Sequence, residues 1–90
     1  DLAAMFKALA DPVRLRLFSL IAAQADEACV CDLTKSFDLS GPTMSYHLKV
    51  LREAGLVSSE RRGTWVYYRL VPDTLEQLAA VLGRTPALAG

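Results

Sequence analysis

The sequence predicts a mainly α-helical domain that carries one β-hairpin near its C-terminal end. Two observations predict this fold class. Apolar residues recur at three- and four-residue spacing from residue 2 to residue 51, which is typical of helices that bury one face. Between residues 57 and 70 the period changes to two, which is typical of paired β-strands. The 90 residues make one small domain, expected over residues 1–84 with a flexible tail at 85–90.

Two helices are expected first. Residues 2–9 are strong helix formers with apolar residues at helical spacing. Asp11 is a favoured N-cap, and Pro12 suits the first helical position because its missing N–H would be unbonded there. The second helix is expected to end near Gln24 and to bury one stripe of side chains: Val13, Leu17, Leu20 and Ile21.

A short helix, a turn and a longer helix follow. The short helix is expected over residues 31–37. Ser40 or Gly41 caps the longer one, and Pro42 takes its first position. Gly55 is suited to end that helix as its C′ residue. Its inward stripe is predicted to be Met44, Leu48 and Leu51.

Two short strands, at residues 57–61 and 64–70, are separated by Arg62-Gly63 and predict a hairpin, after which a final amphipathic helix begins near Pro72. The resulting order is helix, helix, helix-turn-helix, hairpin, helix, or ααααββα, which is that of a winged helix-turn-helix. In this architecture the second helix of the helix-turn-helix enters a major groove of DNA, and the hairpin reaches the flanking backbone.

The charge is unevenly placed along the chain. The net charge is zero, which excludes a globally basic nucleic-acid binder, but residues 40–70 carry five basic groups against two acidic ones. One basic third is compatible with DNA binding through one face, and equally with an ordinary mixed surface.

The composition bounds the class of protein. Hydrophobic residues make up 52% of the chain, so we expect a second copy to cover part of the apolar surface. No apolar run approaches the ~18 residues of a membrane span, and the N-terminus is no signal peptide. The chain is therefore expected in a reducing cytoplasm, where a structural disulfide between its two cysteines is not expected.

Four segments closely resemble the ArsR/SmtB family of bacterial metal-sensing repressors: Phe6–Leu17, Cys29–Leu33, Ser45–Leu56 and Arg61–Leu70. The Cys-x-Cys-Asp-Leu segment is specific to the thiolate-sensing members. The resemblance implies a homodimer, joined by its first and last helices, that holds a promoter closed until ligand binding releases it.

Cys29 and Cys31 are the candidate metal ligands. Residues i and i+2 point the same way in an extended segment, whereas in a regular helix they diverge by about 200°. The two sulfur atoms therefore converge only if the segment is extended or lies at the start of a helix. A helix N-terminus also favours the thiolate. The alternative is that both are small buried apolar residues.

The inducer is expected to be arsenite or antimonite, with Cd²⁺ or Pb²⁺ as alternatives, because these species prefer sulfur. Arsenite takes three thiolates, and this chain has Thr34 where the resemblance implies a third cysteine. We expect the third thiolate from a segment preceding Asp1 or from the other protomer. The family's second metal site, on the last helix, is not expected because residues 73–84 hold no His.

The DNA-binding face is predicted from the helix-turn-helix and the hairpin. Residues near the start of a recognition helix contact base edges, lysine holds phosphate, and hairpin arginines reach the backbone or a minor groove. The candidate residues are Ser40, Thr43, Ser45, Tyr46, Lys49, Arg61 and Arg62. Alone, each could equally be an ordinary solvated residue of a helix or turn.

Three further residues are not assigned to the metal site or to the DNA-binding face. His47 is expected to be a hydrogen-bonded packing residue rather than a ligand or pH switch. Arg14 and Arg16 are left open between phosphate contacts and pairing with acids.

Three alternatives to a metalloid-released repressor remain. Cys29 and Cys31 could form a thiol-redox switch in a regulator of the same fold. The winged helix could serve only protein contacts, in which case a steep salt dependence of DNA binding would be missing. A thiol enzyme is not expected, because the only His lies on the recognition helix and Cys-x-x-Cys is absent.

Overall fold

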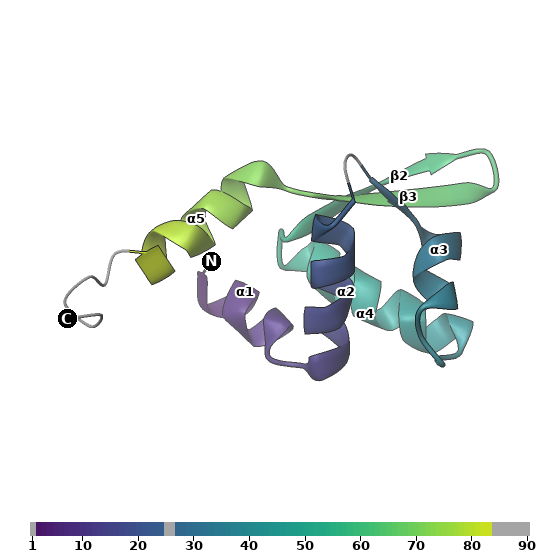
Figure 1. Ribbon diagram of the computed structural model, residues 1–90, viewed down its shortest axis with the longest axis horizontal. Helices are drawn as coiled ribbons and strands as arrows, with labels where there is room; N and C mark the ends of the chain where they lie inside the picture. Colours follow the sequence, from purple (N-terminus) through teal and green to yellow (C-terminus); the bar gives the residue numbers. More distant parts are fainter. Residues whose placement is uncertain (1, 25–26, 84–90) are drawn as a thin grey trace.

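The computed structural model describes residues 2–24 and 27–83. The elements, in chain order, are α1 (Leu2–Leu9), α2 (Pro12–Ala22), β1 (Ala28–Cys29), α3 (Val30–Lys35), α4 (Gly41–Glu53), β2 (Val57–Arg62), β3 (Trp65–Leu70) and α5 (Pro72–Gly83). In that part of the chain α2, α3 and α4 lie beneath a small sheet, with α1 and α5 toward one end of the molecule (Figure 1).

This architecture confirms the winged helix-turn-helix, with one correction. The sequence predicted no strand before the hairpin, yet β1 is present, so the order is ααβααββα. The short helix begins at Val30 rather than at residue 31 and ends before residue 37. A two-residue strand has no periodicity to detect, because it exists only through its pairing with β3. The predicted tail at 85–90 lies outside the described residues.

The sheet has the order β1-β3-β2 and is antiparallel throughout. β3 is therefore the central strand, and β1 is paired with the hairpin that forms the wing. Val57 and Tyr68 are buried on the face that meets the helices. Cys29 lies opposite Tyr67, on the other face of the sheet.

The core lies where α2 and α4 meet the sheet. Its fully buried large side chains are Leu17, Met44, Leu48, Leu51, Leu56 and Val57. This confirms the predicted inward stripe of α4, and it leaves the opposite face of that helix in solvent. Burial of this stripe fixes the rotation of α4 about its own axis.

The C-terminal end of α4 is closed by a Schellman motif. Gly55 has φ +81°, its N–H donates to the Arg52 carbonyl at 3.0 Å, and the Leu56 N–H donates to the Leu51 carbonyl at 3.1 Å. Thr74 of α5 donates its hydroxyl to the Gly55 carbonyl at 2.6 Å. The C-terminal end of α4 is thereby hydrogen-bonded to the residue that precedes β2 and to α5.

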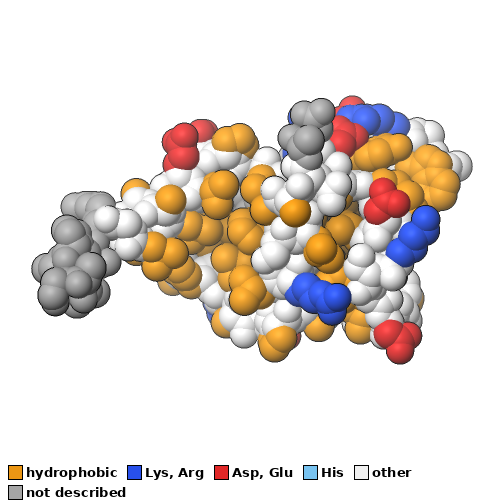
Figure 2. All heavy atoms as spheres, in the orientation of Figure 1, with side chains coloured by type: hydrophobic (Ala, Val, Ile, Leu, Met, Phe, Trp, Pro, Cys, Tyr) orange, Lys and Arg blue, Asp and Glu red, His pale blue; other side chains and the backbone are white. Residues whose placement is uncertain are grey.

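Apolar side chains remain exposed on α1 and α5, and in Figure 2 hydrophobic atoms gather over these helices. The exposed large residues there are Leu2, Phe6, Leu75, Val81 and Leu82. Leu78 is the buried member of the α5 stripe, at 5% exposure. No helix in the described part of the chain is long and apolar enough to span a bilayer.

Candidate thiol pair and nucleic-acid interface

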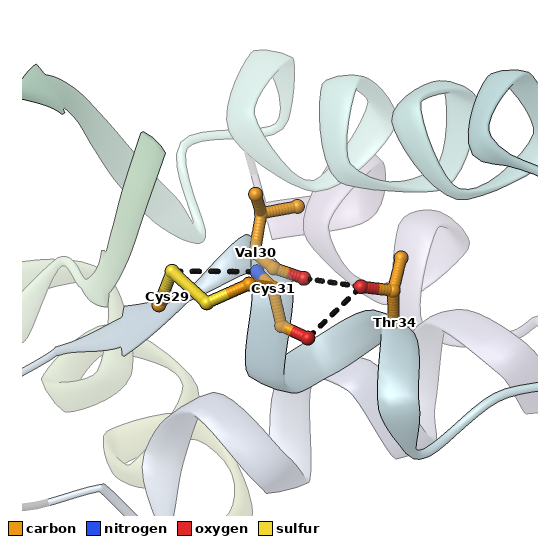
Figure 3. The surroundings of a disulfide bond; sticks show 4 residues. All are labelled: Cys29, Val30, Cys31 and Thr34. Carbon is orange, nitrogen blue, oxygen red and sulfur yellow. Dashed lines mark hydrogen bonds between the residues drawn. A yellow bond between two sulfur atoms is a disulfide. The ribbon is translucent and has the colours of Figure 1, made fainter. Parts of the chain in front are cut away.

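The two cysteines lie where β1 becomes α3. Cys29 is both the last residue of β1 and the N-cap of α3, with extended dihedrals of φ −73° and ψ 138°. Its Sγ accepts a hydrogen bond from the Cys31 N–H at 3.3 Å (Figure 3). The Cα atoms are 5.2 Å apart, and the two Sγ atoms are joined in a disulfide. The two sulfur atoms therefore converge at the start of α3, as metal binding by both cysteines requires.

The disulfide between Cys29 and Cys31 was not predicted, since the sequence analysis excluded only a structural disulfide. Its physical reason is local geometry, because one extended residue followed by the first turn of a helix brings both sulfur atoms to the same place. Only Val30 lies between the two cysteines, so the bond links no separate elements. Cross-links that close such short loops restrict the unfolded chain least. The disulfide therefore contributes little to the stability of the fold.

Within the described part of the chain, the surroundings of the two sulfur atoms add no further ligand. Cys29 is 9% exposed and Cys31 is partly buried. The Thr34 hydroxyl lies 2.8 Å from the Val30 carbonyl and 3.0 Å from that of Cys31, so it is directed at the main chain. Among residues 2–24 and 27–83, no cluster of three His, Cys, Asp or Glu side chains could hold a metal ion.

The start of α4 is organised by two of the predicted DNA-binding residues. Ser40 is the N-cap, and its Oγ accepts a hydrogen bond from the Thr43 N–H at 3.3 Å. The Ser40 hydroxyl lies 2.9 Å from that of Thr43. Ser40, and not Gly41, is therefore the residue that caps this helix; the sequence had left both open.

The outer face of α4 carries the other candidates. Ser45, Tyr46 and Lys49 are exposed, with Tyr46 at 59%, opposite the buried stripe of the same helix. All five candidates at this helix, Ser40 and Thr43 included, are therefore exposed to solvent. Whether they contact DNA stays a prediction.

His47 is a hydrogen-bonded packing residue, as predicted. Its Nδ1 lies 3.2 Å from Arg14 Nη1, and its ring meets that of Tyr46 edge-on at 5.3 Å. Arg14 Nε donates to the Ala8 carbonyl at 2.7 Å, at the end of α1. Arg14 thus links α1, α2 and α4, whereas the guanidinium of Arg16 lies over the Phe37 ring at 5.0 Å.

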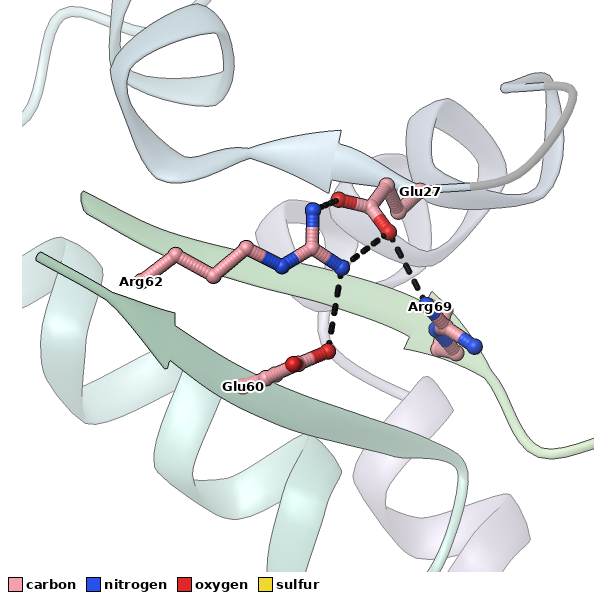
Figure 4. A network of polar contacts seen from close by, with 4 residues as sticks. All are labelled: Glu27, Glu60, Arg62 and Arg69. Carbon is pink, nitrogen blue, oxygen red and sulfur yellow. Dashed lines mark hydrogen bonds and ion pairs between the residues drawn. The ribbon is translucent and has the colours of Figure 1, made fainter.

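The wing arginines differ from each other. Arg61 is exposed, but Arg62 donates to both carboxylate oxygens of Glu27, at 2.5 and 2.7 Å, and to Glu60 at 3.0 Å (Figure 4). Its guanidinium also lies over the Tyr67 ring at 4.6 Å. Arg62 is therefore already engaged by carboxylates, and a phosphate would have to compete with them.

Glu27 and Arg69 are the residues that sequence reasoning missed. Arg69 Nη2 donates to Glu27 Oε1 at 2.9 Å. The hydrogen bond from Arg62, with that of Arg69, lowers the pKa of Glu27 from its ordinary value. Alternation along the hairpin places Arg69 on the outer face of the sheet. The role of Glu27 could not be predicted, because it depends on the pairing of β1 with β3.

Residues 11–59 match the family described as bacterial regulatory protein, arsR family. The arsenic resistance transcriptional regulator ArsR1 of Pseudomonas putida is 49% identical over 78 residues, which are 87% of this chain and 60% of that protein. The arsenical resistance operon repressor of Bacillus subtilis is 48% identical over 73 residues, covering 81% of this chain and 69% of the repressor. The chain belongs to the arsR family.

A solved structure agrees with this membership of the arsR family. A Mycobacterium bovis protein, described as a homodimeric winged helix-turn-helix DNA-binding domain, superposes with a TM-score of 0.75 at 33% identity, covering 90% of this chain and 74% of that one. The arsR family and these relatives are transcriptional regulators, not enzymes. The chain spans only 60% of the Pseudomonas protein, so it corresponds to part of that relative.

Proposed function

We propose that this chain is a homodimeric repressor that binds operator DNA through α4 and the wing and is released when a thiophilic species binds Cys29 and Cys31. Arsenite or antimonite is the proposed inducer, with Cd²⁺ or Pb²⁺ as alternatives. The observation that carries the proposal is the convergence of two sulfur atoms at the point where β1, the strand that pairs with the wing, becomes α3.

The DNA-binding part is supported by the exposed face of α4. Hydroxyls at its N-terminal end can donate to or accept from base edges, and the Tyr46 ring can contact a thymine methyl. Lys49 is placed one turn further along, where a cation suits a phosphate. Among residues 2–24 and 27–83 Arg61 forms no ion pair, which makes it the stronger candidate of the two wing arginines for a backbone contact.

The dimer is supported by the apolar surface of α1 and α5. Phe6 is 38% exposed, Leu75 41% and Val81 40%, and the three lie on helices at the same end of the molecule (Figure 1). Exposed apolar side chains gathered in this way favour association with a second copy. Two-fold symmetry would then present two α4 helices to successive major grooves, ~34–36 Å apart.

The sensing part is supported by the donor set. Once the disulfide is reduced, Cys29 and Cys31 present two thiolates at a helix start, which suit a soft ion, whereas the hydroxyl of Thr34 suits it poorly and is directed at carbonyls. The third thiolate is proposed to come from the second protomer or from a segment preceding Asp1. Binding would draw Cys29 and Cys31 toward that third donor.

The experiment is a binding titration of the protein, after its Cys29–Cys31 disulfide has been reduced, with operator DNA selected by the protein from a random-sequence pool. Arsenite is expected to weaken operator binding at least about fivefold, within the range of ordinary allosteric coupling. Cys29→Ser and Cys31→Ser are expected to bind operator as the parent does and to ignore arsenite. Unchanged affinity with arsenite would defeat the sensing part, while a missing salt dependence would defeat the DNA part.

A second candidate function rests on the disulfide itself. Two thiols and one hydrogen peroxide give a disulfide and two water molecules, so peroxide is a sufficient oxidant for a redox switch at Cys29 and Cys31. If redox sensing is the function, peroxide releases operator and dithiothreitol restores binding, whereas arsenite has no effect on the reduced protein. Release by arsenite alone would exclude this candidate.

A further inference from the structure

Glu27 joins the sensing segment to both strands of the wing. Its side chain is 16% exposed, although its two arginine partners are 45% and 51% exposed. One partner, Arg62, is the last residue of β2, and the other, Arg69, lies on β3. A single carboxylate therefore holds the hairpin at two separated points (Figure 4).

The cysteines share a sheet face with this network. Glu27 directly precedes β1 and is two residues from Cys29, so the two side chains point to the same side of the sheet. The register that places Cys29 opposite Tyr67 also brings Glu27 beside Arg69. Arg62 then covers the Tyr67 ring at 4.6 Å. The thiol pair and the ion-pair network are thus adjacent parts of one surface.

β1 is the least secured strand of the sheet. It forms two residue pairs with β3, Ala28↔Tyr68 and Cys29↔Tyr67, whereas β2 and β3 form six. A pull on Cys29 is therefore more easily accommodated by moving β1 than by opening the hairpin. The carboxylate bonds are what would carry the hairpin along with that strand.

We propose that Glu27 is the positioning residue that transmits ligand binding at Cys29 and Cys31 to the wing, an inference that rests on the proposed function. Displacement of β1 moves the Glu27 carboxylate, and its charge-assisted bonds to Arg62 and Arg69 move the hairpin. Without the carboxylate, β1 moves alone and the wing keeps its place on DNA. Ion pairs with exposed partners add little stability, so the network matters for geometry rather than for folding.

The test compares Glu27→Gln with Glu60→Gln in the complete homodimer. Glu60 accepts from the same Arg62, at 3.0 Å, but lies on β2 within the hairpin, so it is a matched control. The measured quantity is the ratio of operator dissociation constants with and without sodium arsenite. Arsenite stoichiometry and the thermal midpoint are measured on the same samples.

Glu27→Gln is expected to bind arsenite with unchanged stoichiometry and to lower the ratio at least about fivefold, the lower end of ordinary coupling. Glu60→Gln is expected to keep the parent ratio. Arg69→Gln, which frees the carboxylate from β3, is expected to lower the ratio as well and gives a second measurement if Glu27→Gln folds poorly.

Two results would overturn the inference. One is a parent-like ratio in both Glu27→Gln and Arg69→Gln, and the other is an equal loss in Glu60→Gln. If the parent protein itself does not respond to arsenite, the proposed function fails first and the inference fails with it. These outcomes separate the two failures, since only the latter affects the unmodified protein.

Discussion

Replacing the glycines at the two ends of α4, Gly41 and Gly55, by alanine is expected to change stability in opposite directions. At Gly55, φ is +81°, and an added Cβ would meet nothing nearer than the Thr74 hydroxyl at 4.0 Å. The cost of alanine at Gly55 therefore comes from its backbone conformation and not from a clash. The left-handed region costs a non-glycine residue ~1–2 kcal/mol. At Gly41, in the first turn of the helix, an added Cβ meets nothing within 4 Å. Alanine there restricts the unfolded chain and is expected to stabilise by ~0.4–1 kcal/mol.

The two variants are thus expected to differ by ~1.5–3 kcal/mol in free energy of unfolding. Urea unfolding at one fixed protein concentration is the suitable assay, because a dimer's stability depends on its concentration. For a domain of this size each kcal/mol is worth ~4–8 °C in midpoint, so thermal scans provide a second reading. Gly55→Asn should lose less than Gly55→Ala, since asparagine tolerates the left-handed region. A Gly55→Ala variant as stable as the parent would refute the assignment of this end of α4.

Three further outcomes are expected. Lys49→Ala should weaken operator and unrelated DNA alike and reduce the slope of log affinity against log salt by about 1, measured by anisotropy at several salt concentrations. Thr34→Cys should tighten arsenite binding by adding a third sulfur one turn from Cys31, measured by competition with a chelator. The lowered pKa of Glu27 means that its ionised form is favoured in the folded protein, so its contribution is complete above the ordinary value of 4.5 and is lost as pH falls below it. The difference in thermal midpoint between the parent and Glu27→Gln should therefore shrink below about pH 4.5, and a constant difference would contradict the pairing.

The helices and the hairpin could be predicted because each is specified locally. Asp11 accepts from the N–H groups of Val13 and Arg14, as its N-cap position predicted, and Ser40 does the same for α4. Gly63 takes φ +64° in the wing turn, although the turn falls one residue later than the sequence indicated. Caps, turn residues and periodicity act over a few residues, which is the range that a sequence pattern records.

The contacts that position the candidate site could not be predicted because they join distant segments. Arg14 meets His47 across 33 residues, and Arg62 meets Glu27 across 35. Neither pair follows from spacing along one element, and each depends on how the elements pack. The interpretation of His47 succeeded without this contact because it needed only the place of the residue beside a buried stripe.

The position of β1 decides how a ligand at the cysteines can act on DNA binding. If both cysteines lay on one helix outside the sheet, a ligand that displaced them would move only that helix. Here Cys29 belongs to the sheet and Cys31 to α3, so a shared ligand bears on both at once. Through β1 the pull reaches the wing, and through α3 it reaches the turn that leads into α4. Because the core holds α4 by its buried stripe, the weaker two-pair ladder of β1 is expected to yield first. The wing should therefore lose its register on DNA before the recognition helix does, and hydrogen exchange in the arsenite-bound protein should rise in β1 before it rises in α4.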